Sequence, residues 1–150
     1  MIEERYELAL DRIRLMQTED TVGEPYKDYF KKMAEFVLML DELRTELLDG
    51  RYQKLELDEL RKWNRRLYQD VLPGQYEKSY ANPDYACKML GKESGQILGM
   101  LYAELRGAVV YVFEGKTEYL AILYELLIEV YNQFEEEPDP KAVRDTFYWY

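Results

Sequence analysis

The sequence predicts an all-α fold: a single domain of residues 1–150, built as an antiparallel bundle of about five to six helices. Apolar residues recur at three- and four-residue spacing along most of the chain, which is the helical period. Proline and glycine gather in short segments between these stretches, as they do in loops. No segment demands a strand, because even the best candidate, residues 107–113, lies in helical phase with what precedes it.

The first two predicted helices cover residues 3–17 and the stretch from Pro25 to Gly50. Residues 18–24 between them are polar and indicate a loop. Pro25 suits the first turn of a helix and Gly50 suits a C-terminal stop. The second helix carries one continuous apolar stripe, which consists of Tyr29, Phe30, Met33, Phe36, Val37, Leu40, Leu43 and Leu47.

A third, shorter helix is predicted over residues 58–70, with Leu60, Trp63 and Leu67 as its buried side chains. The dipeptide Pro73-Gly74 then breaks the chain, because proline and glycine interrupt helices.

The fourth predicted helix is the longest and forms a central, glycine-containing element. Asn82 suits the N-cap and Pro83 the first helical position. The helical pattern continues to Phe113, and Gly115 is a suitable stop. Thirty or so residues in one helix would span roughly 45 Å.

The last two predicted helices cover residues 117–135 and the segment that begins at Asp139-Pro140. The first has only a narrow polar stripe, so we expect it at the centre of the bundle. The chain ends in four aromatic residues, which either fold back onto the bundle or indicate that the chain is the N-terminal part of a longer one. They are Phe147, Tyr148, Trp149 and Tyr150.

Composition excludes several classes of function. The net charge of −10 argues against nucleic acid and against an anionic membrane surface as partners. No apolar run approaches the ~20 residues of a membrane span, and a single cysteine, Cys87, suits a reducing cytoplasm. The chain has no histidine, which removes histidine-based catalytic triads and histidine-ligated zinc. We therefore expect no catalytic, cofactor-binding or metal-binding residues.

Small residues recur at strict four-residue spacing along the fourth predicted helix. Each interior glycine costs a helix about 0.8–1 kcal/mol relative to alanine, so a compensating contact is expected. Such a row lets another helix approach closely, within the bundle, at a subunit or domain interface, or around a small-molecule groove. The row consists of Gly91, Gly95, Gly99, Ala103 and Gly107.

Two further groups have a structural and a chemical interpretation. Tyr76, Tyr80 and Tyr85 cluster near the fourth helix start, where aromatic packing would fix the loop or a bound anion would sit. Glu125 and Glu129 form either the solvated face of a buried helix or the core of a carboxylate metal site, although no histidine completes the usual di-metal pattern.

Several segments of the chain resemble the N-terminal helical region of leucyl aminopeptidase-like proteins from clostridia, which are related to the aminopeptidase T family of metallopeptidases. The segments are 6–9, 24–30, 62–68, 79–86, 95–98 and 101–106. The resemblance implies a downstream catalytic domain with a two-metal centre, and no metal-ligand motif of that family matches a position here. It therefore implies a non-catalytic accessory domain that packs on the catalytic domain or supports oligomerisation.

Three functions follow as expectations. The first is that accessory domain, without enzyme activity of its own. The second is a self-standing homodimeric interaction module, and the third is a small carboxylate enzyme that uses Glu125, Glu129 and a metal. For the first two, the expected interface residues are the small-residue row and the four terminal aromatics.

Overall fold

The computed structural model describes residues 1–49, 57–74 and 77–135, and throughout these ranges the chain is helical or loop, which confirms the all-α class. The elements in chain order are α1 (Ile2–Thr18), α2 (Tyr26–Leu48), α3 (Leu57–Arg65), the π-helix η2 (Arg66–Val71), α4 (Pro83–Leu90), α5 (Lys92–Arg106), α6 (Val109–Phe113) and α7 (Thr117–Glu135).

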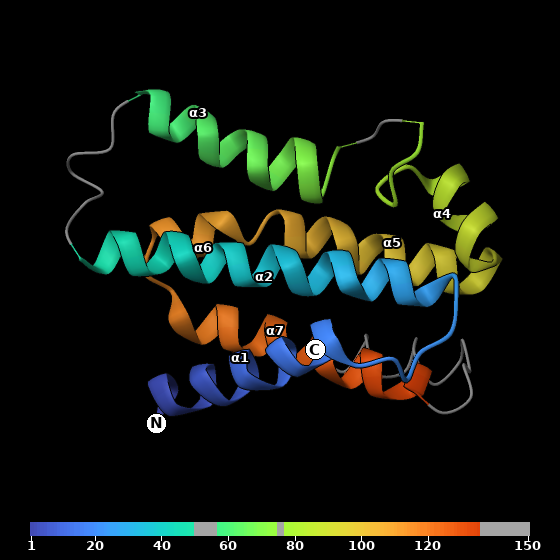
Figure 1. The fold of residues 1–150 in the computed structure, drawn as a ribbon, viewed down its shortest axis with the longest axis horizontal. Coiled ribbons are helices and arrows are strands. Elements are labelled where there is room, and N and C mark those ends of the chain that lie inside the picture. The colour runs from blue at the N-terminus through green and yellow to red at the C-terminus, as the bar shows by residue number, and fades with distance from the viewer. Residues whose placement is uncertain (50–56, 75–76, 136–150) are drawn as a thin grey trace.

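The helices form three stacked levels (Figure 1). The chain runs out along α1, returns along α2, runs out along α3 and η2, returns along α5 and α6, and runs out again along α7. Neighbouring segments of the chain are therefore antiparallel, whereas α1 and α7 run in the same direction. The principal contacts join α1 to α2 and α7, and α4 to α5.

The central position belongs to α2, which contacts α1, η2, α6 and α7. Its predicted stripe is buried along its whole length except at Leu47, which is half-buried. The helix predicted for the centre, α7, has the expected bounds and a mostly buried surface, yet it lies with α1 in the lower level (Figure 1). The expectation of a central α7 was wrong, because α2 contacts α1, η2, α6 and α7, whereas α7 packs mainly on α1.

The predicted third helix has one misassigned residue. Trp63 and Leu67 are buried as expected, whereas Leu60 is 38% exposed. The contact with α2 is made mainly by η2, so Leu60 lies upstream of the part that packs.

The predicted long helix over residues 83–113 is wrong, because the chain breaks there twice. Asn82 caps α4 as expected: its side-chain oxygen accepts hydrogen bonds from the backbone N–H groups of Asp84 (3.0 Å) and Tyr85 (3.4 Å). Gly91 then takes a φ of +90°, which L side chains rarely adopt, and the chain turns between α4 and α5. A second interruption at Gly107 separates α5 from α6.

The predicted sixth helix and the terminal aromatics Phe147, Tyr148, Trp149 and Tyr150 lie outside the described residues, as does Tyr76.

In the described part of the chain one segment, Lys92–Phe113, which comprises α5, the interruption at Gly107 and α6, is long and apolar enough to cross a membrane by length and composition alone. Core helices of soluble proteins pass the same test. Only 39% of its most apolar window is buried in the bundle. Part of the apolar surface of α5 and α6 therefore lies outside the core.

Candidate interaction surfaces

The first half of the small-residue row packs inside the molecule. A Cβ atom added at Gly95 would lie 2.5 Å from the carbonyl oxygen of Ala86 and 2.6 Å from the Cα atom of Cys87. At Gly99 the nearest atom would be the carbonyl oxygen of Tyr80, at 3.3 Å. These two glycines therefore let α4 and the loop before it lie directly on α5, as tight intramolecular packing predicts.

The second half of the row faces outward. Ala103 and Gly107 are exposed, and a Cβ at Gly107 would have as its nearest neighbours only carbonyl oxygens of the preceding turn, at 3.6 and 3.7 Å. Gly91 forms the turn between α4 and α5, and a Cβ added there would have no neighbouring atom within 4 Å. The five residues therefore have three different environments.

An exposed uncharged surface surrounds this second half. Its side chains recur at three- and four-residue spacing, and Met100, Val110 and Phe113 are 48%, 50% and 40% exposed. Charged residues border the surface but none belongs to it. We call it the α5–α6 face, and it consists of Gln96, Met100, Ala103, Gly107, Val110 and Phe113.

A hollow of about 350 Å³ opens beside the α5–α6 face. Arg106 forms one wall: its Nε donates to the carbonyl oxygen of Leu72 at 2.9 Å, and its guanidinium lies 4.7 Å from the centre of the Tyr68 ring. The hollow is lined by Tyr68, Gly74, Ala81, Ala103, Arg106, Gly107, Val109 and Val110.

The loop before α4 is fixed by side chains from α5 and from its own residues. The Tyr102 hydroxyl (3.1 Å) and the Ser79 hydroxyl (2.9 Å) both donate to the carbonyl oxygen of Pro73. Tyr80 packs against Tyr29 and Tyr85, with ring centres 5.3 and 5.5 Å apart. The aromatic interpretation is thus confirmed for Tyr80 and Tyr85.

Buried hydroxyl groups in this aromatic cluster are held neutral. The Tyr80 hydroxyl donates to Asp28 at 3.0 Å, and the Tyr29 hydroxyl donates to the carbonyl oxygen of Leu98 at 2.7 Å. Burial, followed by nearby charge, raises the pKa of Tyr80, and burial raises that of Tyr29. Both therefore act as hydrogen-bond donors rather than as acid–base groups near neutral pH.

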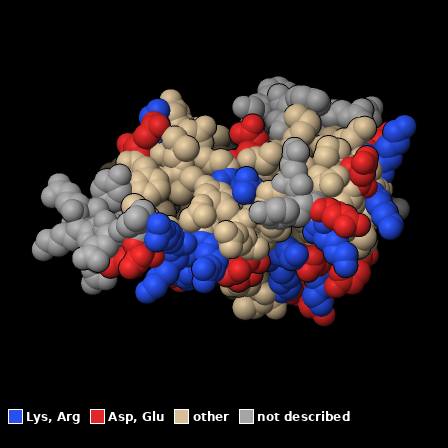
Figure 2. Space-filling model, turned by 90° about the horizontal axis from the view of Figure 1, so that it is seen from above, with Lys and Arg blue, Asp and Glu red and all other residues tan. Residues whose placement is uncertain are grey.

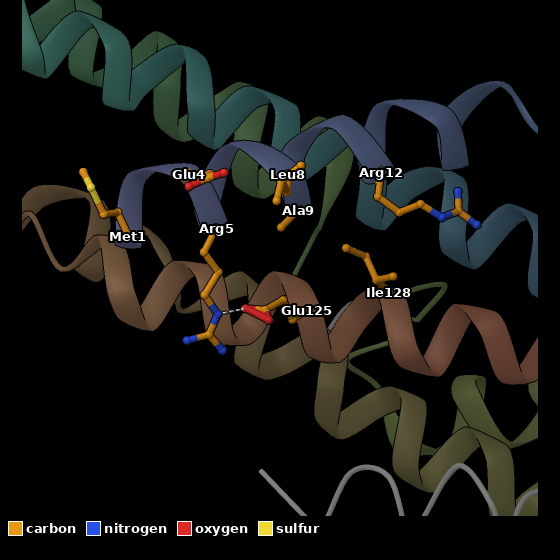
Figure 3. A pocket seen from close by; sticks show the side chains of 8 residues that line it. All are labelled: Met1, Glu4, Arg5, Leu8, Ala9, Arg12, Glu125 and Ile128. Carbon is orange, nitrogen blue, oxygen red and sulfur yellow. Dashed lines mark hydrogen bonds and ion pairs between the residues drawn. The ribbon is translucent and has the colours of Figure 1, made fainter.

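A second hollow lies between α1 and α7, and Figure 3 shows its lining side chains. Its volume is about 400 Å³. Arg5 forms an ion pair with Glu125 across it, and Leu8, which lies on its rim, is 64% exposed. We call it the α1–α7 groove, and it is lined by Met1, Glu4, Arg5, Leu8, Ala9, Arg12, Glu125 and Ile128.

Arg12 closes one end of this groove. It binds Glu19 at 3.0 Å and Glu135 at 3.1 Å, and its guanidinium lies 5.4 Å from the centre of the Tyr131 ring. The end of α1 is fixed nearby, because Lys31 of α2 donates to the carbonyl oxygens of Gln17 (2.5 Å) and Glu19 (2.7 Å). The Lys31 ammonium group also complements the negative end of the α1 dipole, because the last turn of α1 has no basic residue of its own.

The α1–α7 groove was not predicted from the sequence. A usable signal was present, because Met1, Leu8 and Leu15 recur at seven-residue spacing outside the buried stripe of α1.

The described residues contain no group of three histidine, cysteine, aspartate or glutamate side chains placed to hold a metal ion. Glu125 pairs with Arg5, and Glu129 is an exposed residue of α7. Cys87 is half-buried, and its thiol donates to the carbonyl oxygen of Lys92 at 3.6 Å. Acidic and basic side chains lie interspersed on the face in Figure 2, and no basic field dominates it.

No family model, curated protein or solved structure matches this chain. The resemblance to the aminopeptidase-like proteins stays a prediction.

Proposed function

We propose that this chain is a non-catalytic helical domain that binds another protein domain through the α5–α6 face. The proposal rests on one observation. The six exposed positions of the α5–α6 face are all uncharged, although 33% of the residues in the chain are charged. On folded proteins, contiguous exposed apolar patches often mark the sites at which another protein binds.

The local geometry supports a protein partner. Ala103 and Gly107 present no bulky side chain, so a second helix can approach the backbone closely there. The hollow beside them offers room for one large apolar side chain, in the manner of an interface anchor. A membrane is less suitable, because Lys92, Glu93 and Glu104 are exposed charges on the same stretch.

The resemblance adds a candidate partner, the catalytic domain of a metallopeptidase that follows this chain in a longer protein. A cytoplasmic location belongs to the same proposal, since a single cysteine, Cys87, suits a reducing compartment. If the catalytic domain is the partner, residues 1–150 alone would not hydrolyse a leucyl anilide, whichever divalent metal is added. Robust turnover by this chain alone would contradict a non-catalytic role.

Cysteine labelling tests the surface. In a Cys87→Ser background, Met100→Cys and Val110→Cys report on the face, and Met89→Cys, which is 38% exposed on α4, is the control. Labelling by an uncharged maleimide is compared between residues 1–150 and the protein from the complete natural reading frame. We expect at least tenfold slower labelling at the two face positions in the complete protein, and no change at position 89.

Equal labelling of the face positions in both proteins would overturn the proposal. A parallel sample with phosphatidylcholine–phosphatidylglycerol vesicles identifies the other class of partner: protection by vesicles alone would replace the protein partner with a membrane.

A further inference from the structure

A second exposed apolar stripe runs along α1. Met1, Leu8 and Leu15 are 95%, 64% and 55% exposed, and they are spaced seven residues apart. Seven residues is the repeat that keeps one seam of a helix facing a partner helix in a coiled coil. The buried stripe of α1 lies on another side and already packs on α2 and α7.

The two edges of this stripe carry opposite charges. Glu4 and Asp11 lie four residues before and three residues after Leu8, which places both on one side of it. Arg5 lies three residues before Leu8 and Arg12 lies four residues after it, which places both on the other side of the stripe. One edge of the stripe therefore carries the two carboxylates and the other the two guanidinium groups, and Asp11 also pairs with Arg14 of its own helix at 2.7 Å.

This division of charge is complementary to itself in one orientation. When two identical helices pair in parallel about a two-fold axis along their length, the acidic edge of each faces the basic edge of the other. An antiparallel pair about a perpendicular axis would place acidic against acidic. The charges on α1 therefore favour a parallel pair of copies over an antiparallel one.

Arg5 and Arg12 of the basic edge line the α1–α7 groove, and so does Glu4 of the acidic edge (Figure 3). In such a pair the two Leu8 side chains would meet near the two-fold axis, over the mouth of the α1–α7 groove of each copy. Both arginines keep their ion pairs to α7, and their side chains stay 42% and 27% exposed, so the partner's carboxylates can reach them.

We propose that the α1–α7 groove binds a second copy of this chain, with the two α1 helices parallel. The surface is separate from the α5–α6 face, so this inference holds or fails independently of the proposed function.

Light scattering of residues 1–150 across a range of micromolar concentrations tests the dimer. Leu8→Asp removes the central contact, and Leu48→Asp, at a leucine that is 70% exposed on α2, is the matched control. We expect a dimer whose dissociation constant rises at least tenfold with Leu8→Asp and is unchanged with Leu48→Asp. Because both leucines are exposed, circular dichroism should show a native helical signal in both variants.

Disulfide formation tests the orientation. In a Cys87→Ser background, Leu15→Cys should oxidise to a symmetric disulfide in a parallel pair, since the two positions face each other. In an antiparallel pair centred on Leu8 the two Leu15 positions would be 14 residues apart along the axis, about 21 Å. A cross-link at Leu8→Cys but not at Leu15→Cys would overturn the parallel arrangement. A monomer at every concentration, or equal weakening by Leu48→Asp, would overturn the site.

Discussion

The two halves of α5 carry the same spacing of small residues but have opposite surroundings. Around Gly95 the backbone of α4 lies so close that a single added carbon would collide with it. Around Gly107 an added carbon would meet only the preceding turn of its own helix. A four-residue repeat of small residues therefore indicates where close approach is possible, and the surrounding elements decide where it occurs.

Within the small-residue row, the largest expected effect is that of Gly95→Ala. Alanine favours a helix by about 0.8–1 kcal/mol over glycine. Forcing its Cβ against backbone atoms at 2.5–2.7 Å should cost about 3 kcal/mol, at the upper end of overpacking. We expect a net loss of about 2 kcal/mol in the free energy of unfolding, measured by urea denaturation.

Gly107→Ala is the matched control, because its φ of −78° is open to any residue. It should gain about 0.5–1 kcal/mol. If Gly95→Ala stabilised the protein as much as Gly107→Ala, the two halves of α5 would not differ.

The next effect concerns the side chain that links α5 to the Pro73 turn. Arg106→Ala removes a charge-assisted hydrogen bond to Leu72 and the stacking on Tyr68, and should cost about 1.5 kcal/mol. Thermal unfolding followed by circular dichroism measures it. Glu104→Ala, at an exposed residue nearby, is the control and should change the free energy of unfolding by less than ~0.5 kcal/mol. A loss as large as that of Arg106→Ala would show that the contacts of Arg106 with Leu72 and Tyr68 do not account for its effect.

Gly99→Ala should fall between the two ends of the row. Its Cβ would approach the carbonyl oxygen of Tyr80 to 3.3 Å and the Cβ of Ala86 to 3.7 Å, so a small displacement accommodates it. The gain in helix propensity is offset by that displacement, and we expect a net change within ~1 kcal/mol of zero by urea denaturation. A loss equal to that of Gly95→Ala would show that Gly99 is packed as tightly as Gly95.

The smallest effect on stability is expected on the α5–α6 face itself. Val110→Lys, at a residue that is 50% exposed, should change the free energy of unfolding by less than ~0.5 kcal/mol. Val112→Lys, two residues along and 5% exposed, should unfold the protein at much lower urea concentration, because it buries a charge. Similar losses for both variants would mean that Val110 belongs to the core.

Much of the fold was readable from local pattern. The bounds of α7, the cap at Asn82 and the buried stripe of α2 all depend on residues within a few turns of each other. The break at Gly91 was missed, since a glycine in helical phase is compatible with a continuous helix and with a turn of positive φ. The α1–α7 groove was missed because both of its walls had to be known together.

The sequence alone determined the all-α class, most helix boundaries and the lack of any imidazole for catalysis, because each depends on residue type or on helical period. Only the tertiary structure decided that α4 covers Gly95 while Ala103 and Gly107 stay exposed, and that α2 rather than α7 takes the centre. Periodicity shows which side of a helix is apolar. Which neighbour covers that side is set by contacts between segments far apart in the chain, which local spacing does not encode.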